Sequence, residues 1–296
     1  MIRRFHHAEF PVDRLLTAKA GTVVSAVIPA RDEERTVGAI VRCVERDLVA
    51  PGLVDEIVVV DDGSSDTTSA VAAGAGARVV PAGSLLGDEG WGPGKGKAMW
   101  EGLYASSGDV VVYLDADVTN FGPHFVAGLL GPLLLDPDVA LAKGFYERPL
   151  DGVAGQGGRV TELAARPLVS VLFPHLAGFV QPLAGECAGR REVLEQVPFT
   201  HGYGVDLGLL IDVAALAGPG ALVQVDLGSR VHRNRSLPEL SAQATAVLCA
   251  ALDRAGMRLA DHPDHVVLER PTGESVVIRT GTHPPLAQLR ADLRIA

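Results

Sequence analysis

The sequence contains little cysteine and no long uncharged apolar run. The three cysteines, Cys43, Cys187 and Cys249, lie far apart without CxxC spacing, which argues against a disulfide framework or a zinc site. A membrane-spanning helix needs about 18 or more consecutive apolar residues, and residues 1–16 also lack the apolar stretch of a secretory signal. We therefore expect a cytoplasmic protein that does not insert into a membrane.

A net positive charge is also absent, because the formal charge at pH 7 is −10. Non-specific nucleic-acid binding depends on a basic surface that neutralises phosphates, so we expect no nucleic-acid partner. What the chain does contain is 34 glycines, 19 prolines and 47% hydrophobic residues among 296. This composition supports a sizeable core with many short connections, which favours an alternating α/β sheet.

In a sequence, buried parallel strands appear as apolar, β-branched segments that alternate with helical segments. The first half of the chain has this pattern. The second half is less regular and ends in two short segments around the turn PTGE, which we expect to pair as a hairpin. A mostly parallel sheet flanked by helices is the predicted fold. The predicted strands are Thr22–Ile28, Glu56–Val60, Ala77–Val80, Asp109–Leu114, Val139–Phe145, Ala221–Leu227, His265–Leu268 and Ser275–Thr280, and the predicted helices are Glu33–Leu48, Asp66–Ala73, Lys95–Ala105, Gly158–Leu172, Gly189–Gln196, Val205–Ala217 and Leu237–Ala255.

Asp115 and Asp117 follow the buried segment DVVVYL directly. Residues i and i+2 of an extended strand point the same way, so both carboxylates face one ligand at the end of a strand where open α/β sheets bind. Adjacent carboxylates repel each other unless a cation lies near them, and Mg²⁺ or Mn²⁺ on a diphosphate meets this need. The motif predicts a metal and diphosphate site, with a solvated turn or a helix cap as the alternative.

Acidic residues also follow the first two strands. In EIVVVDDGSSDTT, Ser65 or Asp66 can cap the next helix, whereas Asp61 and Asp62 exceed that need and can accept hydrogen bonds from a nucleobase or ribose. The segment PARDEE, residues 29–34, ends the first strand similarly. One of its acidic residues can contact ribose, while the others can simply begin a helix.

Three further segments offer a positive countercharge. In PGKGKAMW, Gly94 and Gly96 let the backbone approach a ligand, and Lys95 or Lys97 can pair with phosphate. An exposed lysine is the alternative for each. The other two segments are GGRVTEL and RVHRNR, at residues 157–163 and 230–235.

In GGRVTEL, Gly157, Gly158, Arg159 and Thr161 lie at a predicted helix start, where backbone N–H groups and the dipole favour an anion. A second phosphate or a carboxylate fits there, and a simple helix cap is the alternative. In RVHRNR, the arginines can bind phosphate in bidentate fashion. A neutral His232 can complete a metal site begun by Asp117, although a lone histidine is usually structural.

In this order, the segments resemble the GT-A glycosyltransferases and, more closely, the actinobacterial glucosyl-3-phosphoglycerate synthases. The resemblance covers about Thr22 to Leu240 and implies a GT-A (Rossmann-like) fold. It further implies transfer of glucose from UDP-glucose to the 2-hydroxyl of 3-phosphoglycerate, with retention and with Mg²⁺ or Mn²⁺. The segments that carry it are VIPARDEE, VDDGSSDTT, PGKGKAMW, LDADV, GGRVTELAARPL, QPLAGE, GYGVDLGLLID and HRNR.

The resemblance also implies a division of the chain. Residues 1–21 form an N-terminal segment, 22–135 a nucleotide-sugar-binding half and 136–240 an acceptor- and metal-binding half. Residues 241–296 form a C-terminal helix and tail, and we expect the hairpin there to contribute to a homodimer.

Roles for individual residues follow from the same resemblance. The catalytic set is Lys95, Asp117, Asp206 and His232, and the metal ligands are Asp117 and His232. The acceptor set is Gly158, Arg159, Val160, Thr161, Asn234 and Arg235. The donor set is Pro29, Ala30, Arg31, Glu33 and Asp62 for uridine, Lys95 for the diphosphate, Asp115, Ala116 and Asp117 for the ribose-phosphate and metal region, Tyr203 and Asp206 for glucose, and Arg230 near the phosphates.

Two departures from the family bear on the donor. The family commonly has Glu where this chain has Asp206, and relatives carry Leu and Asn at the positions of Arg31 and Asp32. The nearest alternative is therefore mannosyl-3-phosphoglycerate synthesis from GDP-mannose. The others are an inverting GT-A transferase with a polyprenyl phosphate or polysaccharide acceptor, a sugar nucleotidylyltransferase, and a nonenzymatic nucleotide-sugar sensor.

The expected chemistry follows from charge. Negative charge grows on the departing UDP phosphate, where the metal and Lys95 would stabilise it. We find no residue clearly committed to a covalent intermediate. Front-face attack, with the leaving phosphate accepting the proton, is therefore our preferred hypothesis.

Overall fold

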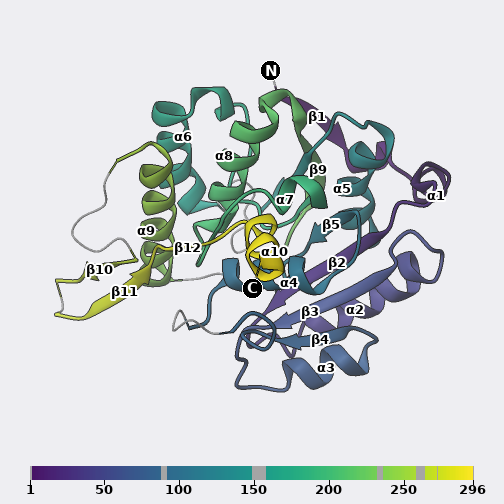
Figure 1. The fold of residues 1–296 in the computed structure, drawn as a ribbon, viewed down its shortest axis with the longest axis horizontal. Helices are drawn as coiled ribbons and strands as arrows, with labels where there is room; N and C mark the ends of the chain where they lie inside the picture. Colours follow the sequence, from purple (N-terminus) through teal and green to yellow (C-terminus); the bar gives the residue numbers. More distant parts are fainter. Residues whose placement is uncertain are drawn as a thin grey trace.

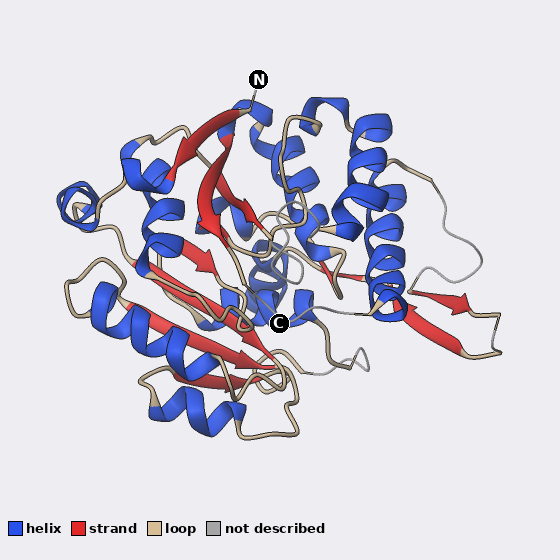
Figure 2. Ribbon diagram, turned by 180° about the vertical axis from the view of Figure 1, so that it is seen from behind, coloured by secondary structure: helices blue, strands red, loops and turns tan. Residues whose placement is uncertain are grey.

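The structure is a computed structural model that describes residues 2–87, 92–148, 158–231, 236–257, 264–271 and 273–295, with side chains to residue 291. Its centre is a sheet of eight strands in the order β1-β9-β6-β7-β5-β2-β3-β4. Helices cover both faces of this sheet (Figure 1, Figure 2). All pairs are parallel except those of β7, which runs antiparallel to β5 and to β6. The predicted fold, a mostly parallel sheet flanked by helices, is confirmed.

The first half of the sheet forms as its apolar segments predict. The buried side chains of β2 alternate between faces: Val24, Ala26 and Ile28 join one apolar cluster and Val27 joins the other. Apolar residues at every position are therefore needed to fill both layers. The elements are β2 (Val24–Ala30), α2 (Val37–Val44), η2 (Glu45–Val49), β3 (Glu56–Asp61), α3 (Thr68–Gly74), β4 (Arg78–Pro81), α4 (Lys95–Ala105), β5 (Val110–Tyr113) and α5 (Pro123–Leu135).

The helix predicted from Glu33 begins only at Val37. Glu33 instead donates its backbone N–H to Thr68 Oγ1 at 2.8 Å, which ties the segment to the start of α3. Asp66 accepts from the N–H of Thr68, the first residue of α3, at 2.9 Å. The N-cap residue itself is Thr67, so Asp66 bonds to the helix start from one position earlier than predicted.

The second half of the sheet contains one clear error of prediction. Residues 189–196 were expected to be helical, but Gly189 and Arg190 end the strand β7, and the helix α7 is only four residues long. Arg190 pairs with Val110 of β5, a contact between segments far apart in the sequence. The strands and helices here are β6 (Leu141–Glu147), η3 (Thr161–Ala165), α6 (Arg166–Leu172), η4 (Pro174–Leu176), β7 (Cys187–Arg190), α7 (Arg191–Leu194), β8 (Phe199–Thr200), α8 (Val205–Ala217), η5 (Pro219–Ala221) and β9 (Leu222–Ser229).

Both ends of the chain pack on this body. The N-terminal segment forms β1, which pairs with β9 at the edge of the sheet. At the other end, the predicted hairpin is confirmed as β10 and β11, and β12 pairs with β8. None of the described helices is both long enough and apolar enough to cross a membrane. These elements are β1 (Arg3–His6), η1 (His7–Glu9), α1 (Val12–Lys19), α9 (Leu237–Arg254), β10 (His265–Glu269), β11 (Ser275–Arg279), β12 (Thr282–His283) and α10 (Leu286–Ile295).

Candidate active site

One cavity of about 740 Å³ lies at the carboxyl ends of β2, β3 and β5. Side chains from α9 and β11 form another part of its wall, which the sequence did not lead us to expect. The predicted residues His232, Asn234 and Arg235 lie outside the described residues. Every other predicted site residue lines this cavity: Pro29, Ala30, Arg31, Glu33, Asp62, Lys95, Asp115, Ala116, Asp117, Gly158, Arg159, Val160, Thr161, Tyr203, Asp206 and Arg230.

Lys95 joins two carboxylates at the start of α4. Its Nζ lies 3.1 Å from both Oδ atoms of Asp206 and 3.0 Å from Oδ1 of Asp115. Burial lowers the pKa of Lys95, but the two carboxylates raise it more, and the net pKa is well above the ordinary value. The ammonium therefore stays charged across the working range of pH.

The two aspartates that share Lys95 differ in charge environment. Burial raises the pKa of Asp206, and Lys95 is the nearest cation that opposes this effect. For Asp115, burial acts in the same direction, but the combined charges of Lys95 and Arg230 lower the pKa below its usual range. Asp115 makes ion pairs with Lys95 and Arg230, whereas the carboxylate of Asp206 pairs with Lys95 and feels the charge of Lys143 without an ion pair to it.

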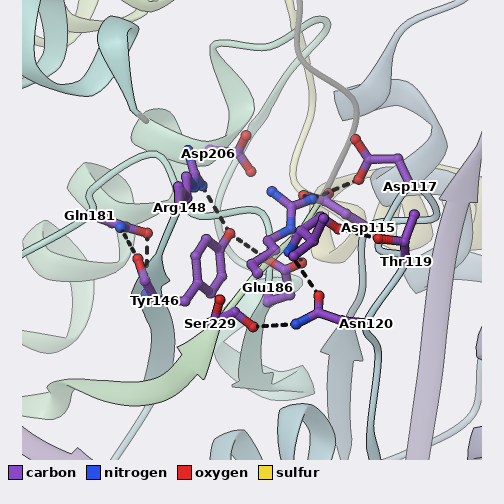
Figure 3. A network of polar contacts seen from close by, with 12 residues as sticks. Asp115, Asp117, Thr119, Asn120, Tyr146, Arg148, Gln181, Glu186, Asp206 and Ser229 are labelled. Carbon is purple, nitrogen blue, oxygen red and sulfur yellow. Dashed lines mark hydrogen bonds and ion pairs between the residues drawn. The ribbon is translucent and has the colours of Figure 1, made fainter. Parts of the chain in front are cut away.

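The carboxylates of Asp115 and Asp117 converge as predicted (Figure 3). The cause is not the expected strand geometry, because β5 ends at Tyr113 and residues 116 and 117 form a turn. Arg230 lies between them, with its Nη2 2.8 Å from Asp115 Oδ2 and 2.7 Å from Asp117 Oδ1. The Nε of Arg230 is 3.1 Å from Oε1 of Glu186, yet the two atoms are not aligned for a hydrogen bond. The two aspartates thus have a cation near them, and it is a guanidinium of the protein itself.

The chemistry of the donor set fits a hard divalent cation. Asp117 presents a carboxylate at the cavity, and carboxylate and phosphate oxygens are the ligands that Mg²⁺ and Mn²⁺ prefer. Within the described ranges, no group of three histidine, cysteine or carboxylate side chains forms a complete metal cage. A metal ion at Asp117 would therefore need further ligands, and those predicted from the sequence are His232 and the oxygens of a bound diphosphate.

The backbone that leads into residue 232 is fixed next to this carboxylate. The N–H of Val231 donates to Asn120 Oδ1 at 2.8 Å, and its carbonyl accepts from the N–H of Thr119 at 3.0 Å. Asn120 also donates to the carbonyl of Ser229 at 2.8 Å (Figure 3). The last described residue before His232 is thus held beside the loop that follows Asp117.

On the predicted nucleoside side, the adjacent aspartates have separate roles. Asp61 turns inward: its Oδ1 accepts from the N–H of Ser64 at 2.8 Å, and its Oδ2 accepts from the hydroxyl of Ser69. Asp62 faces the cavity and accepts from the N–H of Gly94 at 3.1 Å. Burial raises the pKa of Asp62 to about 6. Of the two, Asp62 is the one available to a ligand.

On the predicted acceptor side, Gly158 has a φ of +77°, which only glycine adopts readily, and the following residues enter η3. Sequence reasoning missed a second cation there. Arg148 lines the same cavity and donates from Nη2 to the hydroxyl of Tyr146 at 2.9 Å. That hydroxyl in turn donates to Glu186 at 2.5 Å, and burial raises the pKa of Glu186 (Figure 3). Glu186 lies in the segment QPLAGE. This segment is part of the family resemblance, but no functional role was predicted for any of its residues.

The chain is similar to proteins of known activity. Residues 25–196 match the model of glycosyl transferase family 2. The glucosyl-3-phosphoglycerate synthase of Mycolicibacterium paratuberculosis is 44% identical over 97% of this chain and 91% of the relative. The enzymes of that name from Mycobacterium tuberculosis H37Rv and Petrotoga mobilis are 46% and 40% identical, over 86% and 94% of this chain and 80% and 90% of theirs.

Solved structures agree with the sequence comparison. The crystal structure of glucosyl-3-phosphoglycerate synthase from M. tuberculosis with Mn²⁺, UDP-glucose and phosphoglyceric acid has a TM-score of 0.88 at 39% identity, covering 98% of this chain and 99% of that chain. The same enzyme with Mg²⁺ and UDP has a TM-score of 0.86 at 40% identity, again over 98% of this chain and 99% of that one. The GT-A type of fold is thereby confirmed.

Proposed function

The chain belongs to glycosyl transferase family 2 and, within it, to the glucosyl-3-phosphoglycerate synthases, and from this membership we propose that it transfers glucose from UDP-glucose to the 2-hydroxyl of 3-phosphoglycerate. One observation carries the proposal. A single cavity holds the residues predicted for the donor, around Asp62, Lys95 and Asp115, together with those predicted for the acceptor, at Gly158 to Thr161. The two reacting groups would therefore meet in one cavity.

A divalent cation, held by Asp117 and the predicted His232, would act as a Lewis acid toward the diphosphate. Lys95 supplies a second, permanent positive charge close to where the UDP phosphate gains charge. Arg230 neutralises Asp115 and Asp117, which otherwise would repel an anionic donor. These charges are fixed before the reaction begins, and such preorganisation stabilises a developing anion most effectively.

The acceptor would bind through its own charges. Arg159 and the N–H groups that follow Gly158 are placed for a phosphate or carboxylate, with Asn234 and Arg235 as predicted partners. Arg148 adds a further cation on the same wall. An acceptor held at both of its anionic ends would present its hydroxyl to the anomeric carbon in one orientation.

Retention of the anomeric configuration by front-face attack remains part of this proposal. The carboxylate of Asp206 is buried and already paired with Lys95 through both oxygens, which suits a positioning group better than a nucleophile. We expect the Asp206→Ala variant to give slower transfer with unchanged stereochemistry and no covalent glycosyl adduct. A glycosylated carboxylate isolated from the wild-type protein would exclude the front-face mechanism.

The deciding assay is direct. The protein is incubated with 3-phosphoglycerate, Mg²⁺ or Mn²⁺, and either UDP-glucose or GDP-mannose, and the product is identified by mass and NMR. We expect glucosyl-3-phosphoglycerate and UDP from the first donor. Transfer only from GDP-mannose would show that the donor is not UDP-glucose. Formation of UTP and glucose 1-phosphate from UDP-glucose when pyrophosphate is added would indicate a nucleotidylyltransferase, and binding without any turnover would indicate a sensor.

A homodimer is the proposed assembly. Val267 and Val277 of the hairpin are 42% and 59% exposed, which supports a contact at β10 and β11. Light scattering after gel filtration tests the dimer, and a monomer at micromolar concentration would contradict it. The cytoplasmic location and the lack of a nucleic-acid partner stay predictions.

A further inference from the structure

We propose that His201 and His283 form a positioning pair that holds the loop carrying Lys95, so that the C-terminal tail is a working part of the donor site. The inference rests on the proposed function and adds two residues to it. Neither histidine was selected from the sequence. His201 is 2% exposed and His283 is 4% exposed, and they lie 82 residues apart in the chain.

The tail brings the two rings together. β12 pairs antiparallel with β8, and the N–H of His201 donates to the carbonyl of Gly281 at 2.9 Å. The Nδ1 of His201 then lies 3.2 Å from the Nε2 of His283. On its far side, His283 stacks on Trp100 of α4 with ring centroids 4.8 Å apart, and Trp100 donates to the carbonyl of Pro284 at 2.8 Å.

His201 holds the loop on both sides of Lys95. Its Nε2 lies 3.2 Å from the carbonyl oxygen of Pro93, and its own carbonyl accepts from the N–H of Lys97 at 3.1 Å. Contact is so close that a Cβ added to Gly94 would lie 2.6 Å from His201 Nε2. The N–H of Gly94 meanwhile donates to Asp62. The position of His201 therefore sets where the loop enters α4.

The chemistry of the contacts gives the chain of hydrogen bonds a direction. A carbonyl oxygen only accepts, so the Nε2 of His201 must carry the proton that Pro93 receives. In a neutral ring the Nδ1 of His201 is then an acceptor, and the Nε2 of His283 must donate to it. Burial lowers the pKa of His283 to about 3, which keeps that ring neutral.

The C-terminal segment that carries His283 is anchored to the rest of the protein, so His283 can fix the position of the His201 ring. Leu286 is fully buried, the N–H of Ala287 donates to the carbonyl of Glu195 at 2.9 Å, and Arg290 forms an ion pair with Glu195 at 2.9 Å. The segment from Gly281 to Arg290 thus packs on the body that carries the site. Loss of the His283 hydrogen bond would free the His201 ring, and the loop before Lys95 would lose its fixed place.

Matched variants test the pair. The His283→Phe variant keeps the ring on Trp100 but has no N–H, whereas His283→Gln keeps a donor near the place of Nε2. Likewise His201→Asn loses the reach to Pro93, and His201→Gln retains it. The exposed His175→Gln is the control. We expect His283→Phe and His201→Asn to raise the KM for UDP-glucose about tenfold, as for one lost hydrogen bond, while the KM for 3-phosphoglycerate changes less than about twofold.

The results distinguish failure of the proposed function from failure of the inference about the histidine pair. Turnover by the wild-type protein is measured first, and its absence would overturn the proposed function. With an active wild type, recovery of the KM for UDP-glucose in His283→Gln, together with a smaller rise in His201→Gln than in His201→Asn, supports a positioning pair. An unchanged KM for UDP-glucose in His283→Phe, or equal losses for both substrates and for His283→Gln, would overturn the inference. Should His201→Asn fail to fold by circular dichroism, the His283 variants decide.

Discussion

At the scale of single residues, the site is a compact set of opposite charges in which Lys95 is central. Its ammonium is within ion-pair distance of Asp115 and Asp206, and burial excludes much of the solvent that would screen them. A charge in such a place interacts more strongly with a neighbouring anion than one on the surface. The same residue would therefore affect both the stability of the free protein and the rate of transfer.

Replacement of Lys95 by methionine tests this dual role. We expect the Lys95→Met variant to lose about 100- to 1,000-fold in kcat, the usual effect of removing one group that stabilises a developing anion. Its melting temperature should also fall, because Asp115 and Asp206 would be left buried with less countercharge. Steady-state kinetics and thermal unfolding measure the two effects. The Lys95→Arg variant, which keeps the charge, should unfold close to the wild-type temperature, and a kcat near wild type in Lys95→Met would exclude the assigned role.

Ionisation of Asp62 makes the stability of the fold depend on pH. Burial raises the pKa of Asp62 from 3.8 to about 6, so the folded protein binds this proton more tightly than the unfolded chain does. The ionised carboxylate thus destabilises the fold, and its effect grows as the pH rises from about 4 to about 6 and is constant above that. Asp62→Asn keeps an acceptor for the N–H of Gly94 without the charge.

We expect Asp62→Asn to be more stable than wild type at pH 8, by on the order of 2 kcal/mol after allowance for its partial exposure, and equal to it near pH 4. The KM for UDP-glucose should rise, because a carboxylate binds a ribose hydroxyl or base N–H more strongly than an amide does. Denaturant unfolding at the two pH values, with kinetics at pH 8, measures both. Equal stability gains at pH 4 and pH 8 would show that ionisation is not the cause.

At the scale of elements, the helices with strong local signals were predictable. The bounds of α4 and α8 match the prediction to the residue, because glycines precede both and each is apolar along most of its length. The strand β7 was not predictable. Its four residues, CAGR, run into a helix-favouring REVL, and only pairing with β5 and β6 makes them extended. Such long-range pairing outweighs local propensity.

The same distinction applies to the candidate site. Asp115 and Asp117 could be found from sequence, because they follow a buried strand at its carboxyl end, where open α/β sheets bind ligands. The turn at residues 116 and 117, which sets the direction of the second carboxylate, was not predicted. Glu186 and His201 could not, because their positions depend on partners 40 and 108 residues away. Glu186, for example, meets Tyr146, which is 40 residues earlier. His201 meets Pro93, 108 residues earlier. No short segment of the sequence contains either contact.

Packing between α4 and β8 supplies a prediction at this scale. A Cβ on Gly96 would lie 1.6 Å from the carbonyl oxygen of Thr200, which is backbone and cannot move aside cheaply. We expect the Gly96→Ala variant to lose about 2–3 kcal/mol of unfolding free energy and most of its activity, since Lys95 precedes this contact. Gly74→Ala in α3 is the control, because its Cβ would meet nothing within 4 Å. Denaturant unfolding compares the two, and similar stabilities would contradict the close approach.

At the scale of the whole molecule, the cavity lies where the two apolar clusters on opposite faces of the sheet approach the same edge. Its wall includes Ala30 and Ala116 from one cluster and Ala98 and Val247 from the other. A donor bound there would touch residues from both layers. Binding of the donor should accordingly stabilise the whole fold and not a single loop.

UDP-glucose with Mn²⁺ at about 100 times the dissociation constant should add about 2.7 kcal/mol to the unfolding free energy. For a chain of this size, that corresponds to a rise of about 4 °C in melting temperature. Chelation by EDTA should remove transfer and most of this rise, because Asp117 and the diphosphate would lose the cation between them. Added Mn²⁺ or Mg²⁺ should restore both in wild type but not in Asp117→Ala. Calorimetry and the transfer assay measure these effects together, and full turnover by metal-free protein would exclude a metal at Asp117.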